Sequence, residues 1–123
     1  MNPVELYIYE KEGNHKQILE FLHFWILSLD SEIYPKLKYG IPFYYKKSWI
    51  CYLNPTNDGR VEIAFTRANE LIENASLLEF GIRKQVAGIM ITDIESLPLE
   101  DLNTIMTEAL VIDETVRYSV KKK

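Results

Sequence analysis

The spacing of apolar residues near the start of the chain predicts an amphipathic helix over residues 15–29. Apolar positions there recur every three or four residues, which is the period of one helix face: Ile18, Leu22, Trp25, Ile26 and Leu29. Asn14 suits the N-cap of this helix. Residues 4–9 alternate and are β-prone, which predicts an extended lead-in or a short edge strand. After the helix, residues 32–34 fit a second helical turn, which Pro35 keeps short.

Alternating and β-branched runs in the middle of the chain predict strands. The runs are residues 41–45, 48–53, 60–66 and 85–92. Residues 60–66 alternate cleanly, which indicates one buried face and one face at least partly in contact with water. In residues 48–53 the same rule places Trp49, Cys51 and Leu53 on one face. Ile50 and Tyr52 take the other face, so this strand is expected in the middle of the sheet.

A second amphipathic helix is predicted over residues 99–117, where apolar residues again form one stripe. Glu100 and Asp101 lie in its first turn, where the helix dipole favours acidic side chains. Residues 67–84 fit a loop with a helical turn packed on the core. Hairpin-length connections favour antiparallel pairing. The predicted fold is therefore α+β, an antiparallel meander sheet of about four strands with an N-terminal and a C-terminal helix packed on one face, in a single domain.

Charge and cysteine content narrow the classes of function. The chain has 123 residues, a net charge of −4 and one cysteine, Cys51, so that no intrachain disulfide can form. An acidic chain without a clustered basic face is not expected to bind nucleic acid, and the lysines at 121–123 are expected to be a solvated end. No apolar run is long enough to cross a membrane. The first residues lack the basic segment of a signal peptide, so a cytoplasmic protein is expected.

Residues 38–44, with the sequence Lys-Tyr-Gly-Ile-Pro-Phe-Tyr, resemble the signature of the YdhG-like family of uncharacterised bacterial domains. In that family a Lys-aromatic-Gly-x-Pro segment precedes two hairpin-linked strands. Residues 49–53, 61–65 and 85–91 resemble the strands that follow, and the resemblance runs from about residue 34 to residue 110. It implies the α+β arrangement derived above. Some members are labelled frataxin-like iron chaperones, which implies iron handling on an acidic surface.

Acidic residues around the last helix form the candidate metal site. Iron(II) delivery needs hard oxygen ligands that hold the ion weakly and release it. The candidates lie on the helix or just before it: Asp93, Glu95, Glu100, Asp101 and Glu108. The alternative is a solvated helix face whose first acids are favoured by the dipole. Iron is implied by the resemblance alone, and the sequence identifies no cofactor.

Aromatic residues gather between residues 39 and 52 and form the candidate ligand-binding set. The set is Tyr39, Tyr44, Trp49 and Tyr52. Such side chains combine an apolar body with a polar tip, which suits a surface for a small ligand or a protein partner. Strand alternation sends neighbouring aromatics to opposite faces, so one part of the cluster is expected to join the core. The alternative is ordinary cross-strand aromatic pairing.

Motifs for catalysis are missing from the sequence. It has no Gly-rich phosphate loop and no nucleophile elbow, which weakens an enzyme hypothesis. The leading hypothesis is a metallochaperone-like binding domain that uses the acids around the last helix. The alternative is a module that binds a small molecule or a protein through its Tyr/Trp-rich sheet surface, and an unrecognised enzyme is third. An open sheet face or edge needs covering, which allows a homodimer.

Overall fold

Hairpin-length loops join the first four strands, and the strands therefore pair in chain order. The computed structural model, which describes residues 2–118, contains one antiparallel meander sheet with the order β1-β2-β3-β4-β5. The strands are β1 (Tyr34–Lys38), β2 (Ile41–Tyr45), β3 (Trp49–Pro55), β4 (Val61–Phe65) and β5 (Ala87–Ile91). The predicted α+β class is confirmed, with five strands in place of about four.

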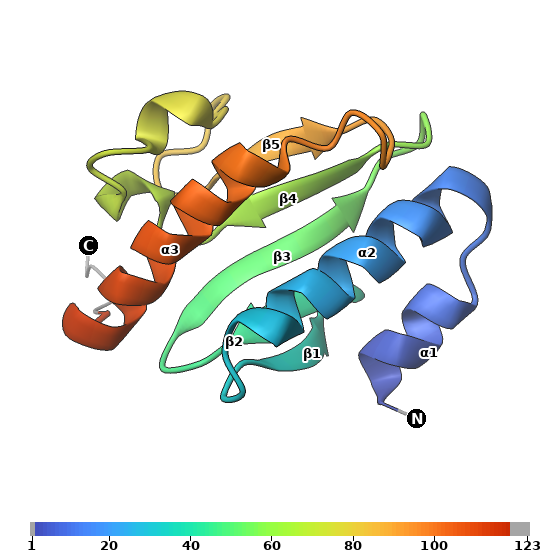
Figure 1. Cartoon of the computed structure of the whole chain (residues 1–123), viewed down its shortest axis with the longest axis horizontal. Helices are drawn as coiled ribbons and strands as arrows, with labels where there is room; N and C mark the ends of the chain where they lie inside the picture. Colours follow the sequence, from blue (N-terminus) through green and yellow to red (C-terminus); the bar gives the residue numbers. More distant parts are fainter. Residues whose placement is uncertain (1, 119–123) are drawn as a thin grey trace.

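Helices cover one face of this sheet. In Figure 1, α2 (Gly13–Leu29) and α3 (Leu99–Thr115) lie across the same face, and α1 (Pro3–Tyr9) lies next to α2. Both amphipathic helices predicted from the sequence are present, and their apolar stripes are buried against the strands. Burying one such side chain contributes roughly 1.5–3 kcal/mol. The core includes Ile18, Leu22 and Ile26 of α2, Ile63 and Phe65 of β4, and Leu102 and Ile105 of α3.

The first helix corrects a prediction, because residues 4–9, expected to be extended, lie within α1. The Asn2 side chain accepts a hydrogen bond from the Val4 amide at 2.7 Å, and the Glu5 carboxylate accepts one from the Asn2 amide at 3.3 Å. This capping box satisfies amides that the first helical turn leaves without partners. Val4 and Ile8, one helical turn apart, are both buried. Capping and packing together outweigh the β propensity of the segment.

The second correction is β1, which begins where a helical turn was expected at residues 32–34 and pairs along its length with β2. A two-residue turn at Tyr39 and Gly40 joins the two strands. Both residues have positive φ, 53° and 77°, as the hairpin turns that match the strand twist require. Pro35 is tolerated because β1 is an edge strand. Pairing across the hairpin therefore decides the conformation of this segment.

A β-bulge changes which side chains of β3 share a face. Tyr44 pairs with Cys51, but Tyr45 pairs with Trp49, so that Ile50 is an extra residue on β3. Cys51 faces the helices with its partner Tyr44, whereas Trp49 lies on the opposite face with Tyr45. The prediction that Trp49 and Cys51 share a face is therefore wrong. Simple alternation fails here because the bulge inserts one residue into its period of two.

The connection between β4 and β5 packs on the core through short helical turns, as predicted. It contains η1 (Ala68–Glu70) and η2 (Ala75–Leu77), and it buries Leu71 and Leu78. No helix within residues 2–118 is long and apolar enough to cross a membrane. The lysines at 121–123, expected to be a solvated end, lie outside the described residues.

Gly88 of β5 lets a side chain approach the backbone closely. A Cβ at this position would lie 2.6 Å from Glu62 Oε2 and 2.7 Å from the carbonyl oxygen of Ile63. The Glu62 carboxylate therefore rests directly on β5. Arg83 holds it there with two hydrogen bonds of 3.2 and 2.8 Å. This ion pair covers part of the sheet face opposite the helices.

Candidate ligand-binding cleft

The sheet face opposite the helices carries a layer of aromatic side chains. Phe43 stacks on Tyr52, its partner across β2 and β3, with ring centroids 4.8 Å apart. Trp49 packs edge-on against Phe43 at 5.6 Å and against Tyr45 at 4.9 Å. The ammonium of Lys38 lies 4.4 Å from the centroid of the Trp49 ring, within cation–π range. The bulge makes this layer possible, because it places Trp49 on the open face.

A cleft of about 200 Å³ opens beside this layer. Its walls come from the sheet and from the segments that follow β4, precede β5 and follow α3. Pockets for drug-sized ligands have volumes of roughly 300–1,000 Å³, so this cleft suits a smaller molecule. The lining residues are Lys38, Phe43, Trp49, Thr66, Arg67, Gln85, Val86 and Tyr118.

Two other hollows in the described part of the molecule suit a ligand less well. The hollow along α2, lined by Phe21, Phe24 and Ile94, is broad and open to solvent. The void beneath α3 has a volume of about 10 Å³, which is room for about one water molecule. The cleft on the open face combines enclosure with charged, polar and aromatic walls. It is therefore the candidate site.

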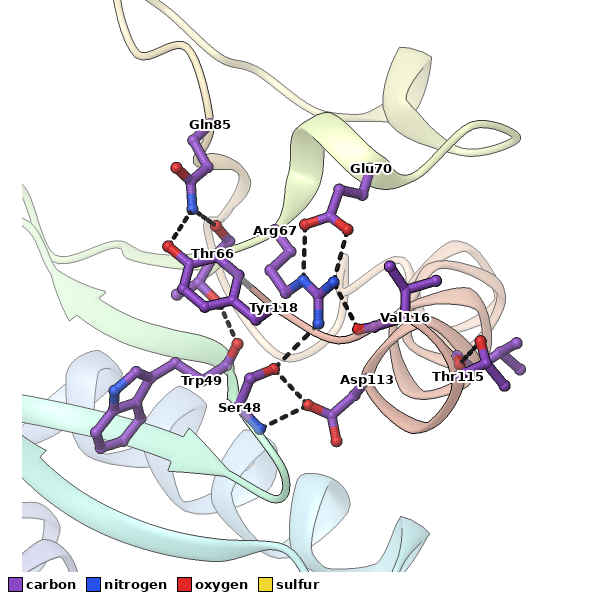
Figure 2. A network of polar contacts seen from close by, with 11 residues as sticks. Ser48, Trp49, Thr66, Arg67, Glu70, Gln85, Asp113, Thr115, Val116 and Tyr118 are labelled. Atoms are coloured by element: carbon purple, nitrogen blue, oxygen red, sulfur yellow. Dashed lines mark hydrogen bonds and ion pairs between the residues drawn. The ribbon is translucent and has the colours of Figure 1, made fainter. Parts of the chain in front are cut away.

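Arg67 lies at the centre of a polar network that borders the cleft (Figure 2). It donates two hydrogen bonds to the Glu70 carboxylate, at 2.7 and 2.6 Å, in the bidentate geometry that guanidinium groups favour. It also donates to the Val116 carbonyl at 2.9 Å and to Ser48 Oγ at 3.3 Å. The Glu70 carboxylate raises the pKa of Arg67. Arg67 as a whole is 7% exposed, and Glu70 compensates its charge.

Hydrogen bonds also order the polar rim of the cleft, as Figure 2 shows. The Gln85 side-chain amide donates to the Thr66 carbonyl at 3.2 Å and to the Tyr118 hydroxyl at 3.1 Å. The Thr66 hydroxyl donates to the Trp49 carbonyl. The Tyr118 ring also lies 5.3 Å from Arg67 Cζ. These contacts tie the segment after α3 to the cleft wall, so the walls are held in place by the protein itself.

Lys38 supplies the positive charge of the cleft. Its ammonium lies 4.4 Å from the Trp49 ring centroid, 5.6 Å from that of Phe43 and 5.4 Å from that of Tyr39. No carboxylate among residues 2–118 forms an ion pair with it. Arg67, the other cation in the lining, is paired with Glu70. Among residues 2–118, the cleft is therefore lined by one ammonium that forms no ion pair with a carboxylate.

Ser48 and Asp113 form a buried joint next to the cleft. Asp113 accepts hydrogen bonds from the amides of Lys47 at 3.0 Å and Ser48 at 2.8 Å, and from the Ser48 hydroxyl. These donors offset the unfavourable position of a carboxylate in the last turn of α3. His15 bonds the Thr56 carbonyl and His23 lies on the helix side, so neither supplies a base for Ser48. The joint fastens the end of α3 to the β2–β3 turn.

The predicted aromatic set divides between the two faces of the sheet. Trp49 and Tyr52 belong to the open-face layer. Tyr39 is 84% exposed at the hairpin turn, with its ring centroid 5.9 Å from that of Phe43. Tyr44 is completely buried and faces the helices. The structure thus brings three members of the set near the cleft and places Tyr44 in the core.

A buried pair on the helix side explains the placement of Tyr44. Its hydroxyl lies 2.8 Å from His23 Nδ1. Burial lowers the pKa of His23, and the nearby Glu5 carboxylate acts in the opposite direction. His23 Nε2 is buried without a hydrogen-bond partner in the described part of the chain. This arrangement keeps the imidazole neutral near pH 7.

Two of the acids proposed as metal ligands are used by the protein itself. Asp93 accepts a hydrogen bond from the Ser96 amide at 2.8 Å, which lowers the pKa of its carboxyl. Glu108 accepts one from the Asn74 side-chain amide at 2.7 Å and one from the Glu73 amide at 3.2 Å. These bonds order the turn before α3 and hold the β4–β5 connection against the helix.

The other predicted metal ligands, Glu95, Glu100 and Asp101, are exposed at the start of α3 and just before it. No three His, Cys, Asp or Glu side chains within residues 2–118 come together in a way that could hold a metal ion. Cys51 is completely buried, and burial raises the pKa of its thiol. The described residues therefore offer neither a preformed metal cluster nor an accessible thiolate.

Several lining residues lay outside the sequence prediction. Lys38 carried a signal, because it stands beside Tyr39 in the segment that resembles a family signature. No pattern in the sequence pointed to Arg67, Gln85 or Tyr118, since they come from three separate segments that come together only in the folded chain. The spacing of hydrophobic residues does not predict contacts between such segments.

No model of a known protein family matches the chain, and searches of curated proteins and of solved structures found no significant match. The resemblance to the YdhG-like family stays a prediction. The case for a function therefore depends on the cleft: its aromatic walls, its hydrogen-bonded rim and the Lys38 ammonium, which forms no ion pair with a carboxylate of residues 2–118.

Proposed function

We propose that this domain binds a small molecule in the cleft on the open face of the sheet. The observation that carries the proposal is the meeting of Trp49 and Phe43 with the Lys38 ammonium, which has no ion-pair partner among residues 2–118, in one partly open cleft. Binding sites are usually concave and mostly apolar, with a few well-placed polar groups. The lining has this character, and the ammonium of Lys38 can orient a ligand.

The rigidity of the cleft supports the same function. Arg67, Gln85 and Thr66 hold the rim through hydrogen bonds that need no ligand. A site that exists before binding loses less conformational entropy when a ligand enters.

The metallochaperone hypothesis remains a second proposal, and the exposed acids near the start of α3, Glu100 and Asp101, are what favour it. Its test is an anaerobic calorimetric titration with iron(II), with magnesium as the control. Saturable, iron-preferring binding that weakens in Asp101→Asn and Glu108→Gln would support it. Binding heats for iron(II) equal to those for magnesium would contradict the metallochaperone proposal.

Two tryptophans allow a direct test of the cleft. Trp49 lines it, whereas Trp25 of α2 donates from its indole nitrogen to Asn103 of α3 at 3.0 Å, on the other side of the sheet. A panel of one- and two-ring fragments is titrated into ¹⁵N-labelled protein, and the two indole N–H signals are followed. Binding in the cleft shifts the Trp49 signal and leaves the Trp25 signal in place.

Two outcomes contradict the proposal. One is a panel in which no fragment moves the Trp49 signal. The other is a set of fragments that move both indole signals equally, which indicates non-specific binding. A Phe43→Ala variant serves as the matched control, because it removes a cleft wall and should reduce the shift of Trp49 for every true ligand.

A further inference from the structure

We infer that the ligand of this cleft is a planar organic molecule with a single negative charge, such as an aromatic carboxylate. Its ring would pack against Trp49 and Phe43, and its carboxylate would meet the ammonium of Lys38. The inference rests on the proposed function and names the class of ligand that the same site takes.

The position of Lys38 decides the sign of the ligand's charge. Aromatic walls alone would suit a cation, because the faces of Trp and Tyr rings attract positive charge. Here the protein's own ammonium already lies near the rings of Trp49, Phe43 and Tyr39. A cationic ligand would meet a like charge at short range. An anionic ligand would instead give Lys38 the ion-pair partner that no carboxylate of residues 2–118 supplies.

The remaining charges limit the ligand to about one negative charge. Arg67 is bound bidentately to Glu70, so it adds no free positive charge to the cleft. The chain as a whole carries a net charge of −4, which disfavours ligands with several phosphates. One ammonium in a mildly acidic protein is matched best by one carboxylate.

The walls favour a flat molecule. Three of the apolar lining side chains are aromatic: Phe43, Trp49 and Tyr118. Aromatic rings pack against one another in stacked or edge-to-face arrangements, which contribute beyond the area that they bury. The volume of about 200 Å³ leaves room for a small ring system and excludes a long chain.

Three probes of nearly equal shape test the inference: 2-naphthoate, 2-naphthamide and 2-naphthylmethylammonium. Their dissociation constants are measured by calorimetry, and the indole signal of Trp49 locates the site. We expect the carboxylate to bind about tenfold more tightly than the amide, since a charge-assisted contact is stronger than a neutral one, and the ammonium to bind most weakly. Raising the salt concentration should weaken the binding of the carboxylate probe alone.

Lys38→Met and Lys36→Met form a matched pair of variants. Lys36 lies two residues earlier on the same strand and the same face, but it does not line the cleft. Lys38→Met should remove the preference for the carboxylate while the amide still binds, and Lys36→Met should preserve the preference. Equal binding of all three probes, or an unchanged preference in Lys38→Met, overturns the inference and leaves the proposed function standing. If no probe moves the Trp49 signal, the proposed function fails as well.

Discussion

The two faces of the sheet carry similar aromatic side chains and use them differently. On the helix face, Tyr44 and Phe65 are buried under α1, α2 and α3, and the Tyr44 hydroxyl meets His23. On the open face, Phe43 and Trp49 form a single layer beside a cleft. The difference follows from what covers each face: α1, α2 and α3 lie on one side of the sheet, and within residues 2–118 no α-helix lies on the other (Figure 1). Coverage, and not residue type, decides whether an aromatic residue belongs to the core or to a candidate site.

The largest expected effect separates the two faces by stability. Phe65→Ala removes a ring that is 1% exposed, and we expect it to lower the free energy of unfolding by about 3–5 kcal/mol. Trp49→Ala removes a half-buried ring from the open face and should cost less, about 1–2 kcal/mol, while it abolishes fragment binding. Urea unfolding measures both. Equal losses would mean that both faces act as core.

The next effect concerns the joint between the helix layer and the cleft. Asp113→Ala leaves the amides of Lys47 and Ser48 without an acceptor, and we expect it to cost roughly 2 kcal/mol in urea unfolding. Glu114→Ala is the matched control. Its carboxylate is exposed, and Lys46 keeps Asp30 as a second partner, so the ion pairs of Glu114 with Lys46 and Lys47 should contribute at most about 1 kcal/mol. A larger loss for Glu114 than for Asp113 would contradict this view of the joint.

A pH dependence should come from the helix face. Burial lowers the pKa of His23 below its ordinary value of 6.5, so the unfolded chain takes up the proton first as the pH falls. The contribution of neutral His23 to the free energy of unfolding is complete above pH 6.5. It is lost as the pH falls towards the folded-state pKa of His23, at up to about 1.4 kcal/mol per pH unit.

Urea unfolding at several pH values between about 7 and 5 tests this contribution, because that interval spans the ordinary pKa of histidine. His23→Gln should flatten the pH dependence. Tyr44→Phe, which keeps the imidazole, should retain it. Identical slopes in the parent protein and in His23→Gln would show that the loss of stability comes from other groups.

The smallest expected effect is a gain in stability. Tyr39→Asn replaces a bulky residue at a φ of 53° by one that tolerates left-handed backbone better. We therefore expect the free energy of unfolding to rise by about 0.5–1 kcal/mol. Ligand affinity should fall if Tyr39 contributes to the site. Tyr34→Asn is the control, since it removes an exposed tyrosine from β1 without relieving positive φ. A loss of stability in Tyr39→Asn would indicate that packing of the ring on Phe43 outweighs the backbone cost.

Much of the fold could be predicted from spacing alone. The stripes of α2 and α3 and the alternation of β4 have periods that only one regular structure satisfies. Three local predictions failed, at residues 4–9, at residues 32–34 and at Trp49, because each local pattern depends on other parts of the chain. Residues 4–9 are β-prone, but Asn2 and Glu5 cap them as a helix. The bulge at Ile50 appears only when β3 is paired with β2.

The candidate site could be predicted less well than the fold. The sequence placed Tyr39, Trp49 and Tyr52 in an aromatic cluster, and the structure brings them near one cleft. It also grouped Tyr44 with them, because hydrophobic spacing cannot say which face the helices cover. Arg67 gave no signal, since its partners Glu70, Ser48 and Val116 become neighbours only when three segments fold together.

The α+β class, the two long helices and most of the strands could be predicted from the sequence, because the period of apolar residues records local geometry. Only folding fixes which face stays open, that Trp49 lies on it, and that Lys38 meets the rings without an ion-pair partner among the carboxylates of residues 2–118. Those facts depend on strand register, on a bulge and on contacts between distant segments. A linear pattern of side chains does not contain them.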